Sequence, residues 1–188
     1  MQKLYCYVDE TGQDTGGGLF IVSVIVTGEE REKLVQILER IEQQSGKGKV
    51  KWMEARHKSR FAYIKEVLST PAFKNTLHFS AYKNTKSYMA LTVLSTARAI
   101  LTSPLPHSSN MVYVDGLPKA RLRWFGTELR RLSVHNSKVA GVRREEANTL
   151  MRLADACCGF VRAALSGEQH ETAKLFEKAK KAEYIKEI

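Results

Sequence analysis

The sequence has few cysteines, the residues that cross-link small secreted domains, and few prolines. It contains 3 cysteines and 4 prolines in 188 residues. The cysteines are Cys6, Cys157 and Cys158, an odd number with two of them adjacent, so they form neither a disulfide framework nor a CxxC zinc pattern. Such cysteine usage is typical of a reducing compartment, and we therefore expect a cytoplasmic protein.

Long apolar runs are also absent. No stretch approaches the roughly 18 consecutive apolar residues that a membrane-spanning helix needs, so we expect no membrane partner. The chain also begins without the charged flank and apolar stretch of a signal peptide. No repeat or interdomain linker stands out, and the length suits one domain with a full hydrophobic core.

Several sequence patterns of catalytic sites are missing. The five histidines show no pair at metal-ligand spacing, which argues against a zinc site. The glycine-rich segment 12–18 lacks the Lys-Ser/Thr ending of a phosphate-binding P-loop. Neither a Gly-x-Ser-x-Gly elbow nor a Cys/His pair supports covalent catalysis.

Acidic residues are outnumbered by basic ones, 20 to 30, which gives a net charge of +10. The excess lies in two blocks, residues 49–86 and residues 116–144. Concentrated basic blocks favour a nucleic-acid partner, although a surface that is merely rich in Lys and Arg is the alternative. The residues that we expect to contact phosphates are Lys51, Lys119, Arg121, Arg123, Arg130 and Arg131.

The hydrophobic pattern predicts an α/β fold. Strands are expected at 4–9, 19–27, 76–82, 111–115 and 138–142. Helices are expected at 29–44, 56–69, 88–101, from Pro118 to about Leu132, at 145–165 and at 168–184. The last helix has balanced charges and an apolar face, and we expect it to pack on the domain or on a second subunit.

Three aspartates end or interrupt apolar segments, namely Asp9, Asp115 and Asp155. A carboxylate in such a place is costly to desolvate unless it is paired, hydrogen-bonded or bound to a cation. If the strands that end at Asp9 and Asp115 are adjacent and parallel, both acids lie at one sheet end, and a later helix can place Asp155 across them. Mg²⁺ or Mn²⁺, hard cations with oxygen ligands, would relieve the repulsion among three carboxylates.

Each aspartate alone also fits a purely structural role. Asp9 can cap a turn, and Asp115 can cap the helix that starts near Pro118. Asp155 can form an ion pair with Arg152 or Arg162.

Several short motifs follow one another along residues 4–165. They are Tyr7-Val8-Asp9-Glu10-Thr11-Gly12, the hydrophobic strand with Phe20, the Lys51 region, Val112-Tyr113-Val114-Asp115 and Leu153-Ala154-Asp155. In these motifs, and in their order and spacing, the chain resembles the family catalogued as domain of unknown function 3800 (DUF3800), which has a ribonuclease-H-like fold.

Three positions depart from the family pattern. Thr11 stands where the family has Ser, and Arg152 where it often has Gln. The family's Glu, two residues before a Lys in the middle segment, is replaced by Lys49 before Lys51, with Glu54 nearby as a substitute.

The resemblance implies a mixed five-stranded sheet flanked by helices, with three antiparallel strands followed by two parallel ones. It implies one such domain over residues 1–167, followed by the C-terminal helix of residues 168–188. It also implies a metal-dependent site at Asp9, Asp115 and Asp155, helped by Glu10.

The expected function is therefore Mg²⁺- or Mn²⁺-dependent hydrolysis of phosphodiester bonds in DNA or RNA. Two alternatives stay open at this point. One is a nucleic-acid-binding protein that keeps the scaffold without turnover, and the other is an interaction or regulatory module that uses the terminal helix.

Overall fold

The computed structural model describes residues 2–16, 18–142, 148–167 and 169–188. The strands are β1 (Lys3–Thr11), β2 (Leu19–Thr27), β3 (Leu77–Lys83), β4 (Ser109–Asp115), β5 (Ser137–Val142) and β6 (Ile185–Glu187). The α-helices are α1 (Arg31–Ser45), α2 (His57–Val67), α3 (Tyr88–Leu101), α4 (Lys119–Arg131), α5 (Thr149–Ser166) and α6 (His170–Lys181). Short 3₁₀ turns, η1 (Gln13–Thr15) and η2 (Pro71–Phe73), complete the described elements.

The strands form one mixed sheet in the order β5-β4-β1-β2-β3-β6. β1, β2 and β3 are antiparallel neighbours, whereas β4 lies parallel to β1 and β5 parallel to β4. The α/β class and the mixed sheet with three antiparallel and two parallel strands are therefore confirmed. The predicted strand count was wrong, because β6 pairs in parallel with β3 and makes six strands.

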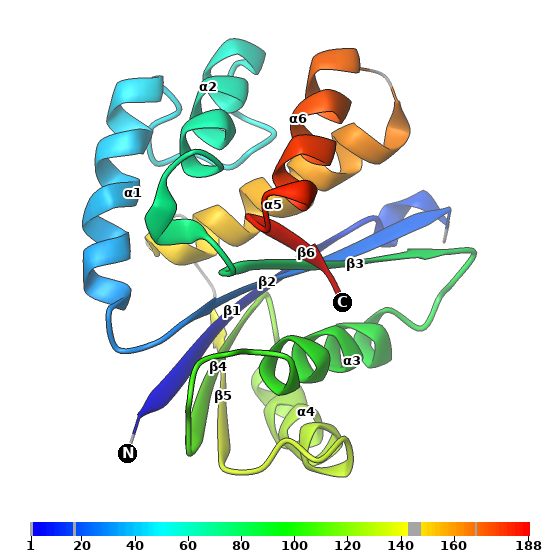
Figure 1. The fold of residues 1–188 in the computed structure, drawn as a ribbon. Coiled ribbons are helices and arrows are strands. Elements are labelled where there is room, and N and C mark those ends of the chain that lie inside the picture. Colours follow the sequence, from blue (N-terminus) through cyan, green and yellow to red (C-terminus); the bar gives the residue numbers. More distant parts are fainter. Residues whose placement is uncertain (1, 17, 143–147, 168) are drawn as a thin grey trace.

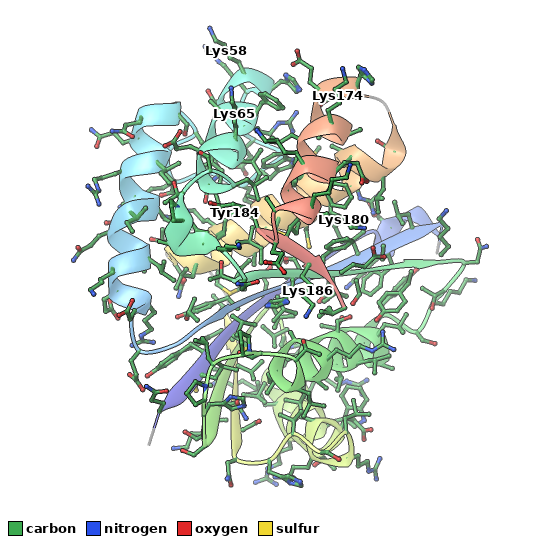
Figure 2. All side chains as sticks on the ribbon, in the orientation of Figure 1. Lys58, Lys65, Lys174, Lys180, Tyr184 and Lys186 are labelled. Atoms are coloured by element: carbon green, nitrogen blue, oxygen red, sulfur yellow. The ribbon has the colours of Figure 1, made fainter. Side chains whose placement is uncertain are left out.

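The extra strand follows from the end of the last helix. The predicted helix runs to Tyr184, but α6 ends at Lys181, and Glu183 then takes a left-handed conformation with φ of 61°. The chain turns there and lays Ile185 beside Leu77 of β3. Lys180 of α6 forms an ion pair of 2.8 Å with Glu187, which holds the strand and the helix together (Figure 2).

Helices cover both faces of the sheet, with α1, α2, α5 and α6 on one face and α3 and α4 on the other (Figure 1). The alternation of side chains along β1 explains the two cores. Tyr7 points to the α5 face, whereas Leu4, Cys6 and Val8 point to the α3 and α4 face. Asp9 therefore shares the α5 face with Tyr7.

The α5 face holds the larger core, and α5 runs across it against β1 and β2. α6 packs on α5 and the sheet through Phe176, whose ring contacts Phe160 at 5.9 Å and Phe79 at 5.5 Å between centroids. The apolar side of α6 is therefore used within the chain. Among the described residues, no helix has the length and apolar character that a bilayer crossing needs.

The helix that carries Asp155 begins later than the sequence pattern predicts. Helix α5 starts at Thr149, and the Asn148 side chain caps it by accepting the N–H groups of Leu150 and Met151 at 3.0 and 3.1 Å. Residues 145–147 of the predicted helix lie outside the described residues. The other predicted helices match the observed ones within a few residues, and α3 has the predicted bounds.

Candidate active site

The parallel pairing of β1 with β4 brings Asp9 and Asp115 to one edge of the sheet. Val8 lies opposite Val114 in the register, and Asp9 and Asp115 are the residues that follow them on the two strands. The site is therefore built where catalytic groups of open α/β sheets commonly lie, at the carboxyl ends of parallel strands.

Helix α5 supplies the third aspartate. Two hydrogen bonds near Asp155 help to fix it on the sheet: the Ser23 hydroxyl of β2 donates to the Ala154 carbonyl at 2.7 Å, and the Cys158 thiol donates to the Asp9 carbonyl at 3.3 Å. Asp155 lies between these two anchors. Asp9, Asp115 and Asp155 line one cavity of about 450 Å³, so the structure brings the three predicted acids together.

Glu10 lines the same cavity, although alternation along β1 turns its side chain toward α3. Its carboxylate accepts the Thr92 hydroxyl of α3 at 3.2 Å and the Gln13 amide at 2.7 Å. Burial raises the pKa of Glu10 to about 7 and the Asp115 charge adds to this rise, while the bonds from Thr92 and Gln13 oppose it.

Asp9 is buried beside two other acids. The residue is 8% exposed. Burial raises the pKa of Asp9 well above its usual range, and the charges of Asp155 and Asp115 raise it further. The backbone N–H of Glu10 opposes these effects only in part. The Asp9 carboxylate is therefore held among like charges, an arrangement that a cation would relieve.

Asp155 is stabilised mainly by a backbone donor. The Trp52 N–H donates to Asp155 Oδ2 at 2.6 Å. Burial raises the pKa of Asp155, and the Trp52 bond together with the charges of Lys47 and Lys51 limits that rise. The ion pair with Arg152 that the sequence left open is not formed, because Arg152 pairs with Glu42 instead.

The segment before α2 is locked against α5 beside Asp155. The Trp52 indole lies against Gly159, where an added Cβ would fall 2.1 Å from the ring. The Arg60 guanidinium lies over the indole, 5.4 Å from its centroid. These contacts hold the segment that contains Lys51, and Lys51 lines the cavity.

The acids suit a hard divalent cation in chemistry and position, since all are carboxylates that share one buried cavity. As the side chains stand, no three acidic, histidine or cysteine groups among the described residues are close enough to hold a metal ion by themselves. Mg²⁺ commonly binds through one or two carboxylates and completes its coordination with water and substrate phosphates. The donor set fits that mode of binding better than a closed protein cage.

The basic helix α4 does not reach this cavity. It packs on the opposite face of the sheet through Phe125 and Leu129. Arg130 and Arg131 lie at its far end, where they contact Thr127 at 3.1 Å and Glu128 at 2.7 Å. None of the predicted α4 contacts lines the cavity: Lys119, Arg121, Arg123, Arg130 and Arg131.

Two arginines that sequence reasoning did not assign to the site do line it, Arg60 of α2 and Arg162 of α5. Arg162 is seven residues after Asp155, which is two helical turns, so both side chains lie on one helix face. The sequence offered Arg162 only as an ion-pair partner of Asp155, a pair that does not form among the described residues. Arg60 carries no comparable signal, because its place depends on how α2 packs.

A scan against protein-family models finds no match, and no curated protein matches the sequence. Solved structures do match. The crystal structure of ribonuclease H2 from Pyrococcus horikoshii OT3 superposes with a TM-score of 0.57 at 11% identity, over 95% of this chain and 76% of that one. RNase HII from Archaeoglobus fulgidus, in its complex with PCNA, gives a TM-score of 0.53 at 14% identity, over 95% and 77%. The chain therefore has a ribonuclease-HII-like fold.

Proposed function

We propose that this protein is a divalent-metal-dependent nuclease that hydrolyses phosphodiester bonds in DNA or RNA. The observation that carries the proposal is the meeting of Asp9, Asp115 and Asp155, which come from three distant parts of the sequence, in one cavity. The raised pKa of Asp9, caused by burial and by the other two acids, supports it. Perturbed carboxyl groups in a cleft are typical of functional sites.

The fold supports the same reaction class. The solved structures that this chain resembles are ribonucleases, and membership of DUF3800, with its ribonuclease-H-like fold, is part of the proposal. The acids also border a second cavity, since Asp9, Glu10 and Asp115 line both the first cavity and another of about 540 Å³. A polymer can therefore extend to both sides of the acids.

In this proposal Asp9, Asp115 and Asp155 hold Mg²⁺ or Mn²⁺ together with oxygens of the substrate. A cation bound there would polarise the phosphoryl group and lower the pKa of a coordinated water. The Trp52 N–H fixes the orientation of Asp155. Thr92 and Gln13 fix Glu10, which orients water or an outer ligand. Lys51 contacts the substrate backbone.

The test is cleavage of labelled single- and double-stranded DNA and RNA by the wild type and by Asp9→Asn. Replacement of one metal-binding acid should reduce cleavage in Mg²⁺ or Mn²⁺ to the level seen with chelator. Glu177→Gln, an exposed acid on α6, is the control and should keep wild-type activity. Cleavage that survives both Asp9→Asn and the chelator would reject the mechanism.

One observation favours a second candidate, a nucleic-acid-binding protein without turnover. The described residues include no ready-made group of three metal ligands. This reading requires salt-sensitive binding that is indifferent to divalent ions and to the loss of Asp155. Calorimetric titration of Mn²⁺ into wild type and Asp155→Ala separates the two, since only the nuclease requires heat of binding that disappears in the variant.

A further inference from the structure

The cavity that holds the acids is also lined by basic side chains. Besides the carboxylates, Lys51, Arg60 and Arg162 line it. Its volume of about 450 Å³ lies within the range of roughly 300–1,000 Å³ that is usual for ligand sites. Among the described residues, the acids and the two guanidinium groups of this cavity form no ion pair with each other.

The Arg162 guanidinium is fixed in place but poorly satisfied. Its Nη2 donates to the Leu19 carbonyl at 2.9 Å, and its Nε is buried without a hydrogen-bond partner. Gly12, with φ of 104°, packs so closely on this group that an added Cβ would lie 2.2 Å from Nη2. The loop after β1 therefore holds the guanidinium at the cavity without neutralising it.

Arg60 of α2 is also held in place with few hydrogen bonds. Its Nη1 makes two long contacts, of 3.4 Å to the Trp52 carbonyl and 4.0 Å to the Met53 sulfur, and its Nε is also buried without a partner. The indole beneath it keeps the guanidinium plane in position. Because the same residue, Trp52, donates to Asp155, the arginine and the acid are held by one anchored segment.

Neither guanidinium has an anion of its own. Over the described residues, no carboxylate lies within ion-pair distance of Arg60 or Arg162, although both line a cavity with four acids. A half-buried cation with unused N–H donors is unfavourable unless a ligand or water completes its bonds. A guanidinium offers five donors in a planar fork that matches a phosphate group.

We propose that Arg60 and Arg162 form a phosphate subsite, which binds the nucleic-acid backbone in the same cavity as the acids. This inference rests on the proposed function. These two arginines, in place of helix α4, make the main contact with the nucleic-acid backbone near the acids. The ligand is a phosphodiester of a DNA or RNA strand, and exposed Met53 and half-buried Phe61 beside the arginines provide apolar contact for its sugar or base.

The experiment measures binding in chelator, so that cleavage plays no part. Fluorescence anisotropy of a labelled single-stranded DNA and of the matching RNA is recorded over a series of KCl concentrations. The variants are the double substitution Arg60→Gln/Arg162→Gln and a control, Arg40→Gln/Arg98→Gln. The control removes the same charge from two exposed arginines that do not line the cavity.

The cavity variant should bind both strands at least roughly tenfold more weakly at low salt, because two charge-assisted contacts are lost. Its slope of log K against log salt should also be smaller by about 0.7 for each phosphate contact removed from a single strand. The control should lose less and keep the wild-type slope. Equal losses in the two double variants would mean that only overall charge matters, and would overturn the subsite.

Two further variants are measured in the same binding experiment. Arg60→Lys/Arg162→Lys retains both charges but loses the two planar guanidinium groups. This variant should fold, and its affinity for the strands should lie between those of the wild type and the Gln variant. Asp9→Asn should bind at least as tightly as wild type, which separates a failed subsite from failed catalysis. A wild-type protein that binds neither strand at any salt concentration overturns this proposal and the nucleic-acid function together.

Discussion

Arg152 of α5 and Glu42 of α1 form a bidentate ion pair in the interior, with Nε–Oε1 and Nη2–Oε2 distances of 2.7 Å each. Both side chains are 2% exposed. Lys47 lies 4.0 Å from the same Glu42 oxygen and donates to the Val50 carbonyl at 2.7 Å. The pair therefore joins α1 to the helix that carries Asp155 and to the segment that leads to Trp52.

Replacement of one partner should be strongly destabilising. Glu42→Gln removes the buried negative charge that Arg152 and Lys47 contact, and we expect the free energy of unfolding to fall by about 3–5 kcal/mol. Urea unfolding at neutral pH measures the change. Glu39→Gln on the same helix is the control, since its pair with Lys49 is exposed and 3.9 Å long and should contribute less than about 1 kcal/mol. Similar losses in the two variants would show that the buried pair has no special role.

The Asp9 variant should be more stable than wild type when no metal is present. Because the pKa of Asp9 is raised on folding, its protonated form is favoured in the native state. Its stabilising effect is complete below the pKa of the unfolded chain and is lost as pH rises toward and through the folded pKa, so above the unfolded pKa this carboxyl group makes the fold less stable. Asp9→Asn removes that penalty.

Thermal unfolding with chelator and with Mg²⁺ checks this prediction. In chelator at neutral pH, Asp9→Asn should have the higher Tm. In Mg²⁺ the wild type should gain stability through ligand binding, whereas the variant should gain none. A variant that is less stable in chelator would show that the Asp9 carboxylate is satisfied without a cation.

Glu10 should titrate near neutral pH in the metal-free protein. Burial raises its pKa to about 7, and the Thr92 hydroxyl limits the rise by donating to the ionised carboxylate. Thr92→Val removes that donor, so the midpoint should move to higher pH. Carboxyl ¹³C chemical shifts measure it directly, with Thr102→Val at the exposed end of α3 as the control. A midpoint near that of a free glutamate would contradict the burial of this group.

The sequence pattern was sufficient for the five longer strands, because each is an apolar or alternating run. It failed at β6, since three residues give no periodic signal and their pairing with β3 depends on the turn at Glu183. The same limit applies to Glu42. It lies four residues after Leu38 and thus on the buried stripe of α1, but only the packing of α5 supplies Arg152 as its partner.

For the site, the sequence indicated the three aspartates because each interrupts an apolar segment. It did not indicate Arg60, since a basic residue on an amphipathic helix is usually exposed. Lys58, from the same basic block, does extend from α2 away from the sheet (Figure 2). Which members of such a block face a cavity depends on tertiary packing, and here Trp52 and Gly159 decide it.

Gly159 should be essential for the position of Trp52. An added Cβ would lie 2.1 Å from the indole, so Gly159→Ala forces the ring, and with it the donor to Asp155, to move. We expect a loss of about 1–3 kcal/mol, typical of overpacking, and a change in Trp52 fluorescence. Gly126→Ala in α4 is the matched control, because its Cβ would meet Val139 at an ordinary 3.7 Å.

The control should be neutral or stabilised by up to about 1 kcal/mol, since alanine is the better helix former. Both variants are compared in a Trp124→Phe background, so that the emission comes from Trp52 alone. If Gly159→Ala behaves like Gly126→Ala in stability and spectrum, the Trp52 indole does not need the space that Gly159 leaves by lacking a Cβ. The anchoring of Asp155 through Trp52 would then have to be abandoned.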